Sequence, residues 1–358
     1  MQSRMKSFLG GAAVAALLVS SGGADAGQDR TWTKGPAQNF NVHAIALDHV
    51  VADVTISVTN GGPASLSIQG PRYLVNDMHA QDGNGTLTIS GPQNSSHNFN
   101  VWDWSKWFDY SDVNEQHVKV MLSVPRGSAV DARHMIGALS VGDLMGHLSV
   151  ETVSSDVKVG RVTDAKLKVV GGGDISVTAV TNGLSLDVAG SGDVHVGPVG
   201  SSATVSIAGS GDTTLSNVGG GLSVNIAGSG SLDVGTVNGP VSVSTAGSGD
   251  VKIAGGTANP LKVSMVGGGD LDFGGTAVNP TISAIGSGDV WIKAYTGHLS
   301  TSGMADVRIG NEDGDDDGDH HHMHMPPVPP VPPVPSIPAP SAPPAPPAPP
   351  APHNTHGG

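Results

Sequence analysis

The sequence predicts an all-β protein, a right-handed parallel β-solenoid with about 19 residues in each coil. Three observations predict it. The phrase G-S-G-D, or a close variant of it, occurs seven times between residues 171 and 289, at steps of 19 or 20 residues. Two runs of alternating apolar and polar residues lie in each step. The apolar positions are mostly Val, Ile and Leu, and such alternation with β-branched residues is typical of strands.

Each repeat holds too few apolar residues to form a core alone, so neighbouring repeats must stack. The simplest arrangement places one repeat in each coil, with the same column of side chains above and below. Further coils begin at Ala138 and Asp156, and 307–309 should be the last strand. The regular solenoid is expected over residues 131–309. Its nine coil starts between Ala138 and Asp289 predict a length of about 43 Å.

The alternation assigns inward and outward positions. We expect Val194, Leu215, Val234 and Ile253 to form one inward column. Small polar residues on the second strand of each repeat should form two outward columns: Thr204 and Ser206, Ser223 and Asn225, Ser242 and Ser244, Thr281 and Ser283, Ser300 and Ser302. This face is either an ordinary solvated surface or a regular hydroxyl array that meets a repetitive ligand such as a glycan, another polymer or ice.

The aspartates of the repeats should form a ladder in the turns: Asp174, Asp193, Asp212, Asp250, Asp270 and Asp289. Neighbouring carboxylates about 4.8 Å apart repel by on the order of 1 kcal/mol in water. We expect backbone N–H groups of the turns to offset this repulsion, and the glycines to provide positive φ or close approach of coils. A row of Ca²⁺ ions is the alternative. However, calcium-binding solenoids use repeats of about nine residues, and Ser231 interrupts this ladder.

The G-S-G-D repeat, with its flanking L-x-V-x-I and D-V-x-V strands, resembles the bacterial GIN-domain family, often labelled auto-transporter adhesin heads. The resemblance covers 130–309 well and 36–130 loosely. It implies a single-stranded β-helix that is exported from the cytoplasm and has no established activity.

Residues 1–26 are typical of a secretory signal peptide. Arg4 and Lys6 provide the positive start, 8–19 is apolar, and A-D-A at 24–26 is a cleavage motif. A membrane anchor is the alternative, but the apolar run is short for one. We therefore expect export to the periplasm, the outer surface or the medium, with no transmembrane segment after cleavage.

Residues 27–130 alternate without the 19-residue period. Strands are expected at 51–58, 64–68, 86–89 and 118–124, and the D-G-N-G sequence at 82–85 predicts a turn. We expect these residues to form less regular coils that cap the solenoid and protect its open edge from pairing with other chains.

An aromatic segment interrupts this region: Trp102, Trp104, Trp107, Phe108 and Tyr110. It either covers the end or the side of the solenoid or forms a sugar-binding platform. In a platform the rings would face sugar rings, and Asp103 and Asp109 would accept hydroxyl protons.

Residues 310–358 form a tail of different composition, expected to be disordered and, in its Pro-rich part, extended. Six acidic residues lie within 311–319, and an imidazole cluster follows them: His320, His321, His322 and His324. Together with Met323 and Met325 this cluster suits copper, nickel or zinc. A solvated spacer is the alternative.

Composition narrows the function. The formal net charge of −14 argues against nucleic acid or an anionic membrane as partner, and the absence of Cys excludes disulfides and thiolate chemistry. The sequence contains no G-x-S-x-G, P-loop, H-E-x-x-H or dinucleotide-binding motif. We expect a non-catalytic envelope module, binding or adhesion-like, that requires no cofactor. Its partner should be a glycan, a cell-surface polymer or an envelope protein. The alternatives are metal handling through the tail and a β-helical enzyme that acts on polysaccharide.

Overall fold

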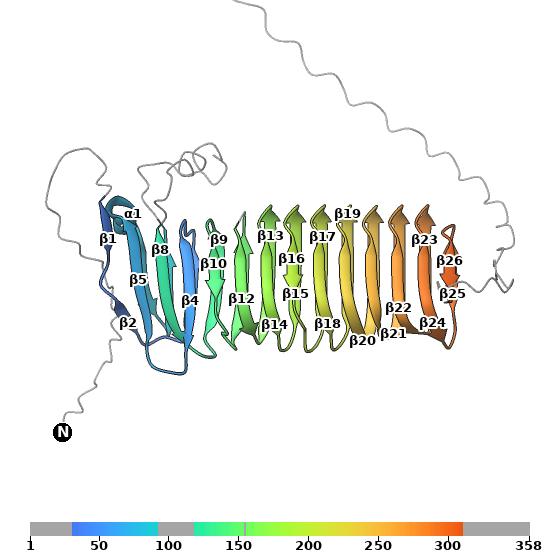
Figure 1. Cartoon of the computed structure of the whole chain (residues 1–358), viewed down its shortest axis with the longest axis horizontal. Coiled ribbons are helices and arrows are strands. Elements are labelled where there is room, and N and C mark those ends of the chain that lie inside the picture. Colours follow the sequence, from blue (N-terminus) through green and yellow to red (C-terminus); the bar gives the residue numbers. More distant parts are fainter. Residues whose placement is uncertain (1–30, 92–117, 154, 311–358) are drawn as a thin grey trace, which may run out of the picture. The chain divides into compact units, whose positions relative to one another are not determined.

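The structure, a computed structural model, describes residues 31–91, 118–153 and 155–310 (Figure 1). These residues form 26 strands and one short helix. The architecture is the predicted parallel β-solenoid. Each regular coil contributes two strands, and each strand pairs in parallel with the strand one coil before it and one coil after it. We call the stack of first strands ladder 1 and the stack of second strands ladder 2.

Ladder 1 of the regular part contains ten strands, with the first parts of β20 and β21 among them: β10 (Leu139–Val141), β12 (Val157–Val162), β14 (Ile175–Val180), β16 (Val194–Val196), β18 (Thr213–Val218), β20 (Leu232–Gly247), β21 (Val251–Gly267), β22 (Leu271–Val278), β24 (Val290–Thr296) and β26 (Val307–Ile309). Ladder 2 contains the remaining parts of β20 and β21 and seven further strands: β11 (His147–Thr152), β13 (Asp164–Gly171), β15 (Leu184–Gly190), β17 (Ala203–Gly209), β19 (Leu222–Gly228), β23 (Thr281–Gly286) and β25 (Ser300–Gly303).

The core lies between the two ladders. Alternate residues of each strand point inward and are almost completely buried, most of them Val, Ile, Leu and Ala. Because the period repeats, like residues stack on like residues, as in the run Val205, Val224 and Val243. The thin core leaves little room for aromatic side chains, and Phe273 is its largest fully buried member.

The predicted inward column of Val194, Leu215, Val234 and Ile253 is wrong in one member. Leu215, Val234 and Ile253 pair in succession. Val194 is buried too, but Val196 is the residue beside Leu215. Val194 directly follows its turn aspartate, whereas Leu215 is the third residue after its own. The two positions therefore belong to adjacent inward columns of ladder 1.

A column of glycines ends the ladder 2 strands: Gly190, Gly209, Gly228, Gly247, Gly267 and Gly286. Both predicted reasons for glycine apply here. Gly209 has φ 144°, and a Cβ added to it would lie 2.1 Å from the carbonyl oxygen of Gly190. Any side chain in this column would therefore collide with the backbone of the preceding coil.

The N-terminal region forms further coils and, at the outer end, antiparallel strands. Its elements are β1 (Trp32–Lys34), β2 (Gln38–Phe40), β3 (Ala44–Asp48), β4 (Asp53–Thr59), β5 (Ala64–Pro71), α1 (Arg72–Asn76), β6 (His79–Gly83), β7 (Thr86–Ser90), β8 (Lys119–Pro125) and β9 (Ala129–Met135). The four predicted strands are present as β4, β5, β7 and β8, and the D-G-N-G turn joins β6 to β7. Asn84 and Gly85 have positive φ there, as a tight hairpin requires.

The coils of this region do not stack in chain order. β3 pairs with β7 on one side and β9 on the other, while β4 pairs with β8 and β10. The coil made of β3 and β4 is thus inserted between two coils that follow it in the sequence. At the outer end, β5 and β6 run antiparallel to β8 and β7, and β1 and β2 run antiparallel to β5. This reversal ends the parallel stack.

Helix α1 was not predicted, because five residues are too few to show a helical period, and it buries only Val75. Among the described residues, no helix has the length and hydropathy needed to span a bilayer. The predicted signal peptide, the aromatic segment and the tail lie outside the described residues.

Candidate functional site

Two groups of predicted site residues lie outside the described part of the chain: Trp102, Trp104, Trp107 and Tyr110 of the aromatic segment, and His320, His321, His322 and His324 of the tail. Neither sugar binding nor metal binding at these positions is tested by the structure. The candidate site is therefore built from the surface of the solenoid itself.

An open groove of 650 Å³ runs across the outward face of ladder 2. Its lining comes from consecutive strands of the stack, from β7 through β3, β9, β11, β13 and β15 to the start of β17. The floor follows one outward column, made of Ala46, Asp131, Ser149, Lys166 and Ser185. The groove thus runs along the stack, across the strands, and its floor combines the small side chains of Ala46, Ser149 and Ser185 with the charged side chains of Asp131 and Lys166.

Beyond the groove, the same column continues as the small polar residues predicted from the sequence. Ser185 pairs with Thr204, which pairs with Ser223 and then with Ser242. The second predicted column pairs in the same manner, and none of the ten predicted residues is buried. Ladder 2 therefore presents a regular polar face to solvent.

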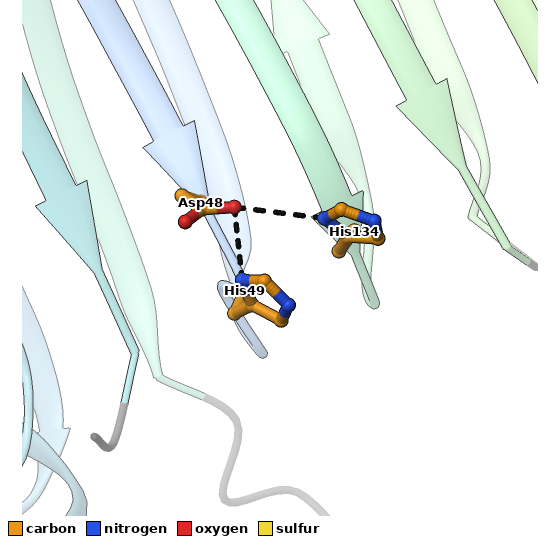
Figure 2. A group of neighbouring side chains, drawn as sticks. All are labelled: Asp48, His49 and His134. Carbon is orange, nitrogen blue, oxygen red and sulfur yellow. Dashed lines mark ion pairs between the residues drawn. The ribbon is translucent and has the colours of Figure 1, made fainter. Parts of the chain in front are cut away.

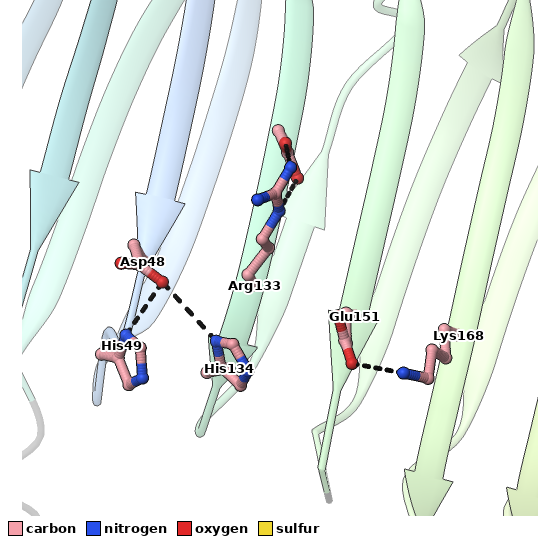
Figure 3. Close-up of polar contacts among 7 residues, drawn as sticks. Asp48, His49, Arg133, His134, Glu151 and Lys168 are labelled. Carbon is pink, nitrogen blue, oxygen red and sulfur yellow. Dashed lines mark hydrogen bonds and ion pairs between the residues drawn. The ribbon is translucent and has the colours of Figure 1, made fainter.

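The N-terminal part of the second column carries charges of alternating sign. Asp48, Arg133, Glu151, Lys168 and Asp187 occupy the same position on successive coils. Adjacent members of a parallel ladder are about 4.8 Å apart, so unlike charges attract at each step. This alternation allows charged side chains to stack without the repulsion expected of the aspartate ladder (Figure 3).

Two ion pairs shift pKa values within this charged column. The Lys168 ammonium lies 2.6 Å from Glu151 Oε1 and is the main reason that the pKa of Glu151 is lowered from 4.5. This pair stabilises the fold above pH 4.5, and its contribution is lost as the pH falls through the lowered pKa. Arg133 donates hydrogen bonds to both carboxylate oxygens of Asp131, and these bonds raise the pKa of the Arg133 guanidinium.

A cluster of three side chains lies where β3 and β9 end. Asp48 points between two imidazoles, and its Oδ1 lies 2.9 Å from Nδ1 of His49 and 3.5 Å from Nδ1 of His134 (Figure 2). The two imidazole rings stack with centroids 4.4 Å apart and an interplanar angle of 19°. Each of the three side chains is about half exposed.

Sequence reasoning missed this cluster. L-D-H at 47–49 and A-R-H at 132–134 each end a strand of alternating residues, which is the only signal in the sequence. The two segments become neighbours because the β3–β4 coil is inserted out of chain order.

The aspartate ladder lies in the turns before ladder 1. Every ladder carboxylate except that of Asp289 accepts a hydrogen bond from the backbone N–H at the same position on the next coil. The N–H of Asp212 lies 3.2 Å from Oδ1 of Asp193, and the N–H of Asp270 lies 2.8 Å from Oδ1 of Asp250. Ser231 donates its own N–H to Asp212 but has no carboxylate to continue the series. Backbone donors thus contact these carboxylates within the protein.

A family model described as "Putative auto-transporter adhesin, head GIN domain" matches residues 49–257, more than half of the chain. The chain belongs to this family. The match begins at the inserted β3–β4 coil and includes all of the groove between β9 and β17.

Solved structures similar to this GIN-domain chain include several titled as adhesins and one titled as a putative lipid binding protein. A putative adhesin from Parabacteroides distasonis is 14% identical, covering 79% of this chain and 98% of its own, with a TM-score of 0.39. One from Parabacteroides merdae is 13% identical, covering 78% and 96%, with a TM-score of 0.38. A putative cell adhesion protein from Clostridium sporogenes is 10% identical, covering 60% and 100%, with a TM-score of 0.24. A comparison with curated proteins gives no match.

Calcium should not stabilise this GIN domain through its aspartate ladder. Backbone N–H groups already contact the carboxylates. Each Ca²⁺ requires about six to eight oxygen ligands, which one carboxylate per coil does not provide. We expect millimolar Ca²⁺, added to protein freed of metal by EDTA, to leave the melting temperature unchanged, as measured by circular dichroism. A rise of many degrees, lost in an Asp212→Ala variant, would assign the ladder to calcium instead.

Proposed function

We propose that this GIN domain is an exported, non-catalytic adhesin module that binds an extended polymer, most simply a neutral glycan, along the groove of ladder 2. The groove carries the proposal, because its long direction crosses consecutive coils. A pocket for a small molecule encloses its ligand in a cavity, whereas an open groove along a repeat accepts a chain whose own units repeat.

The side chains of the face suit such a ligand. Ser149 and Ser185 on the groove floor, and Thr204 and Ser223 beyond it, can each donate and accept a hydrogen bond. Short side chains lose little rotamer freedom when a ligand orders them, so the polar contacts incur a small entropic cost. The formal net charge of −14 disfavours an anionic polymer and favours a neutral one.

The distribution of titratable groups supports a binding role over a catalytic one. Acid–base catalysis on polysaccharide needs a local pair of carboxyl groups beside the scissile bond. No ladder carboxylate lines the groove, and backbone N–H groups contact these carboxylates. The groove's own carboxylates, Asp131 and Asp164, are paired with Arg133 and His147. The shifted pKa values of Glu151 and Arg133 arise from surface ion pairs. We therefore propose that the bound polymer is not cleaved.

Export is part of the proposal and depends on the signal-peptide pattern of residues 1–26. A periplasmic or surface location would bring the groove into contact with envelope or host glycans. The proposed adhesive role is consistent with the family to which the chain belongs.

Binding to a glycan array and to whole cells tests the proposal. We expect the full-length protein to bind neutral polysaccharides and a Ser149→Trp variant, whose side chain would fill the groove, to bind at least tenfold more weakly. Ser176→Trp is the matched control, because Ser176 is an exposed outward residue of ladder 1. Both variants should melt like the wild type.

Three outcomes would contradict the proposal. Binding to no glycan would exclude the ligand class. Equal binding by wild type and Ser149→Trp would exclude the groove. Release of shorter oligomers from the bound polymer would show an enzyme.

A further inference from the structure

We propose that Asp48, His49 and His134 bind a divalent transition-metal ion, Zn²⁺ by preference, that links two neighbouring coils. Asp48 and His49 come from the inserted β3 coil, and His134 comes from β9 of the next coil (Figure 2). One ligand atom from each residue lies within 4.8 Å of the other two.

The two distances from the carboxylate to the imidazoles are close to those of a zinc site. Zinc binds imidazole nitrogen and carboxylate oxygen at about 2.0–2.2 Å, so ligand atoms around a tetrahedral ion are about 3.3 Å apart. Asp48 Oδ1 lies 2.9 Å and 3.5 Å from the two Nδ1 atoms, on either side of this value. Because an imidazole binds a metal in the plane of its ring, binding requires the stacked rings of His49 and His134 to rotate until both Nδ1 atoms face the ion. Because the cluster is half exposed, water can complete the coordination.

The Nδ1 atom of His134 supports a ligand role. It is shielded from solvent and forms no hydrogen bond within the described part of the chain. Its distance of 3.5 Å from Asp48 Oδ1 exceeds that of a good N–H···O hydrogen bond. A buried polar nitrogen without a hydrogen bond destabilises a fold, and a metal ion would satisfy it.

The backbone holds both imidazoles in place by unusual means. His134 forms a bulge, because Arg133 pairs with Glu151 while Met135 pairs with Thr152. His49 and His134 both have φ 52°, a left-handed conformation that is uncommon outside glycine. Bulges re-aim a side chain out of the regular strand pattern, here toward the carboxylate of Asp48.

The chemistry of the donors selects the metal. Two imidazoles and one carboxylate suit Zn²⁺ and its transition-metal neighbours, whereas Ca²⁺ and Mg²⁺ prefer oxygen ligands alone. Arg133 would repel a cation, but its guanidinium is paired with Asp131. Without metal, His49 Nδ1 donates to Asp48. Ligation requires that proton to move to Nε2 or to solvent, leaving the Nδ1 lone pair for the ion.

Zinc-dependent melting of the full-length protein tests the site. It is preferable to a measurement of total bound zinc, because zinc bound by the tail histidines would add to that total. An ion that joins two coils stabilises the folded state, so Zn²⁺ should raise the melting temperature. His134→Asn should weaken this effect at least tenfold in zinc concentration, because Asn accepts the left-handed backbone but lacks the imidazole. His195→Asn, an exposed position on ladder 1, is the matched control and should retain the effect.

Zinc-soaked crystals should show an anomalous difference peak between the two Nδ1 atoms and Asp48 Oδ1. Asp48→Asn preserves the side-chain shape and should remove both the peak and the thermal shift. This second variant keeps the proposal testable if His134→Asn fails to fold. An unchanged zinc effect in Asp48→Asn, or crystals without the peak, would overturn the proposal.

Discussion

Val224→Asp is expected to abolish cooperative folding. Val224 is 2% exposed and lies in the inward column between Val205 and Val243. A carboxylate there has no partner, and the cost of burying it is several kcal/mol, comparable to the total stability of about 5–15 kcal/mol of a typical domain. Because each coil supports its neighbours, the defect should spread along the stack. Circular dichroism should show no sigmoidal melt.

The adjacent residue provides the control. Ser223 is exposed on the outward column of ladder 2, so Ser223→Asp should change the free energy of unfolding by no more than about 0.5 kcal/mol. A Val224→Asp protein that melts within a few degrees of the wild type would show that this column does not face the core.

Gly228→Ala should lower the free energy of unfolding by more than about 2 kcal/mol. Gly228 has φ 138°, and an added Cβ would lie 2.3 Å from the carbonyl oxygen of Gly209. The backbone cannot yield easily, because Gly228 also pairs with Gly247 on the other side. Urea unfolding should show a lower midpoint with a similar slope.

Gly255→Ala is the matched control for this prediction. Gly255 lies in the same solenoid without a positive φ, and the nearest atom to an added Cβ is 3.8 Å away. The substitution should leave the free energy of unfolding unchanged or raise it by up to about 1 kcal/mol, because alanine reduces the conformational entropy of the unfolded chain. Equal losses in the two variants would mean that glycine matters for chain entropy and not for the close approach of coils.

The regular coils could be predicted from the sequence because their period and alternation repeat many times. It is harder to predict which residues stack in the same inward column, since this depends on how many residues separate each one from the preceding turn. Val194 is the first residue after its turn aspartate and Leu215 is the third, so they lie in adjacent columns. The glycine column was predictable because the glycines recur at the same position in successive repeats.

The polar columns of ladder 2 could be predicted, but the groove and the histidine cluster could not, because each depends on contacts between coils. His49 and His134 meet only because the β3–β4 coil enters the stack between later coils, and the sequence has no period there to reveal that order. The groove likewise depends on small side chains that lie side by side on different coils: Ala46, Ser149 and Ser185. The first of these, Ala46, belongs to the irregular N-terminal region.

The affinity of the protein for oligosaccharides of increasing length tests the central claim most directly. The groove crosses strands from β7 to the start of β17, a distance of about 29 Å at the usual strand spacing. Calorimetry with oligomers of the polysaccharide that binds best should show affinity rising with length until the ligand spans about 29 Å and then levelling off. A monosaccharide that binds as tightly as the longest oligomer would contradict the proposal, because it would place recognition in a single pocket.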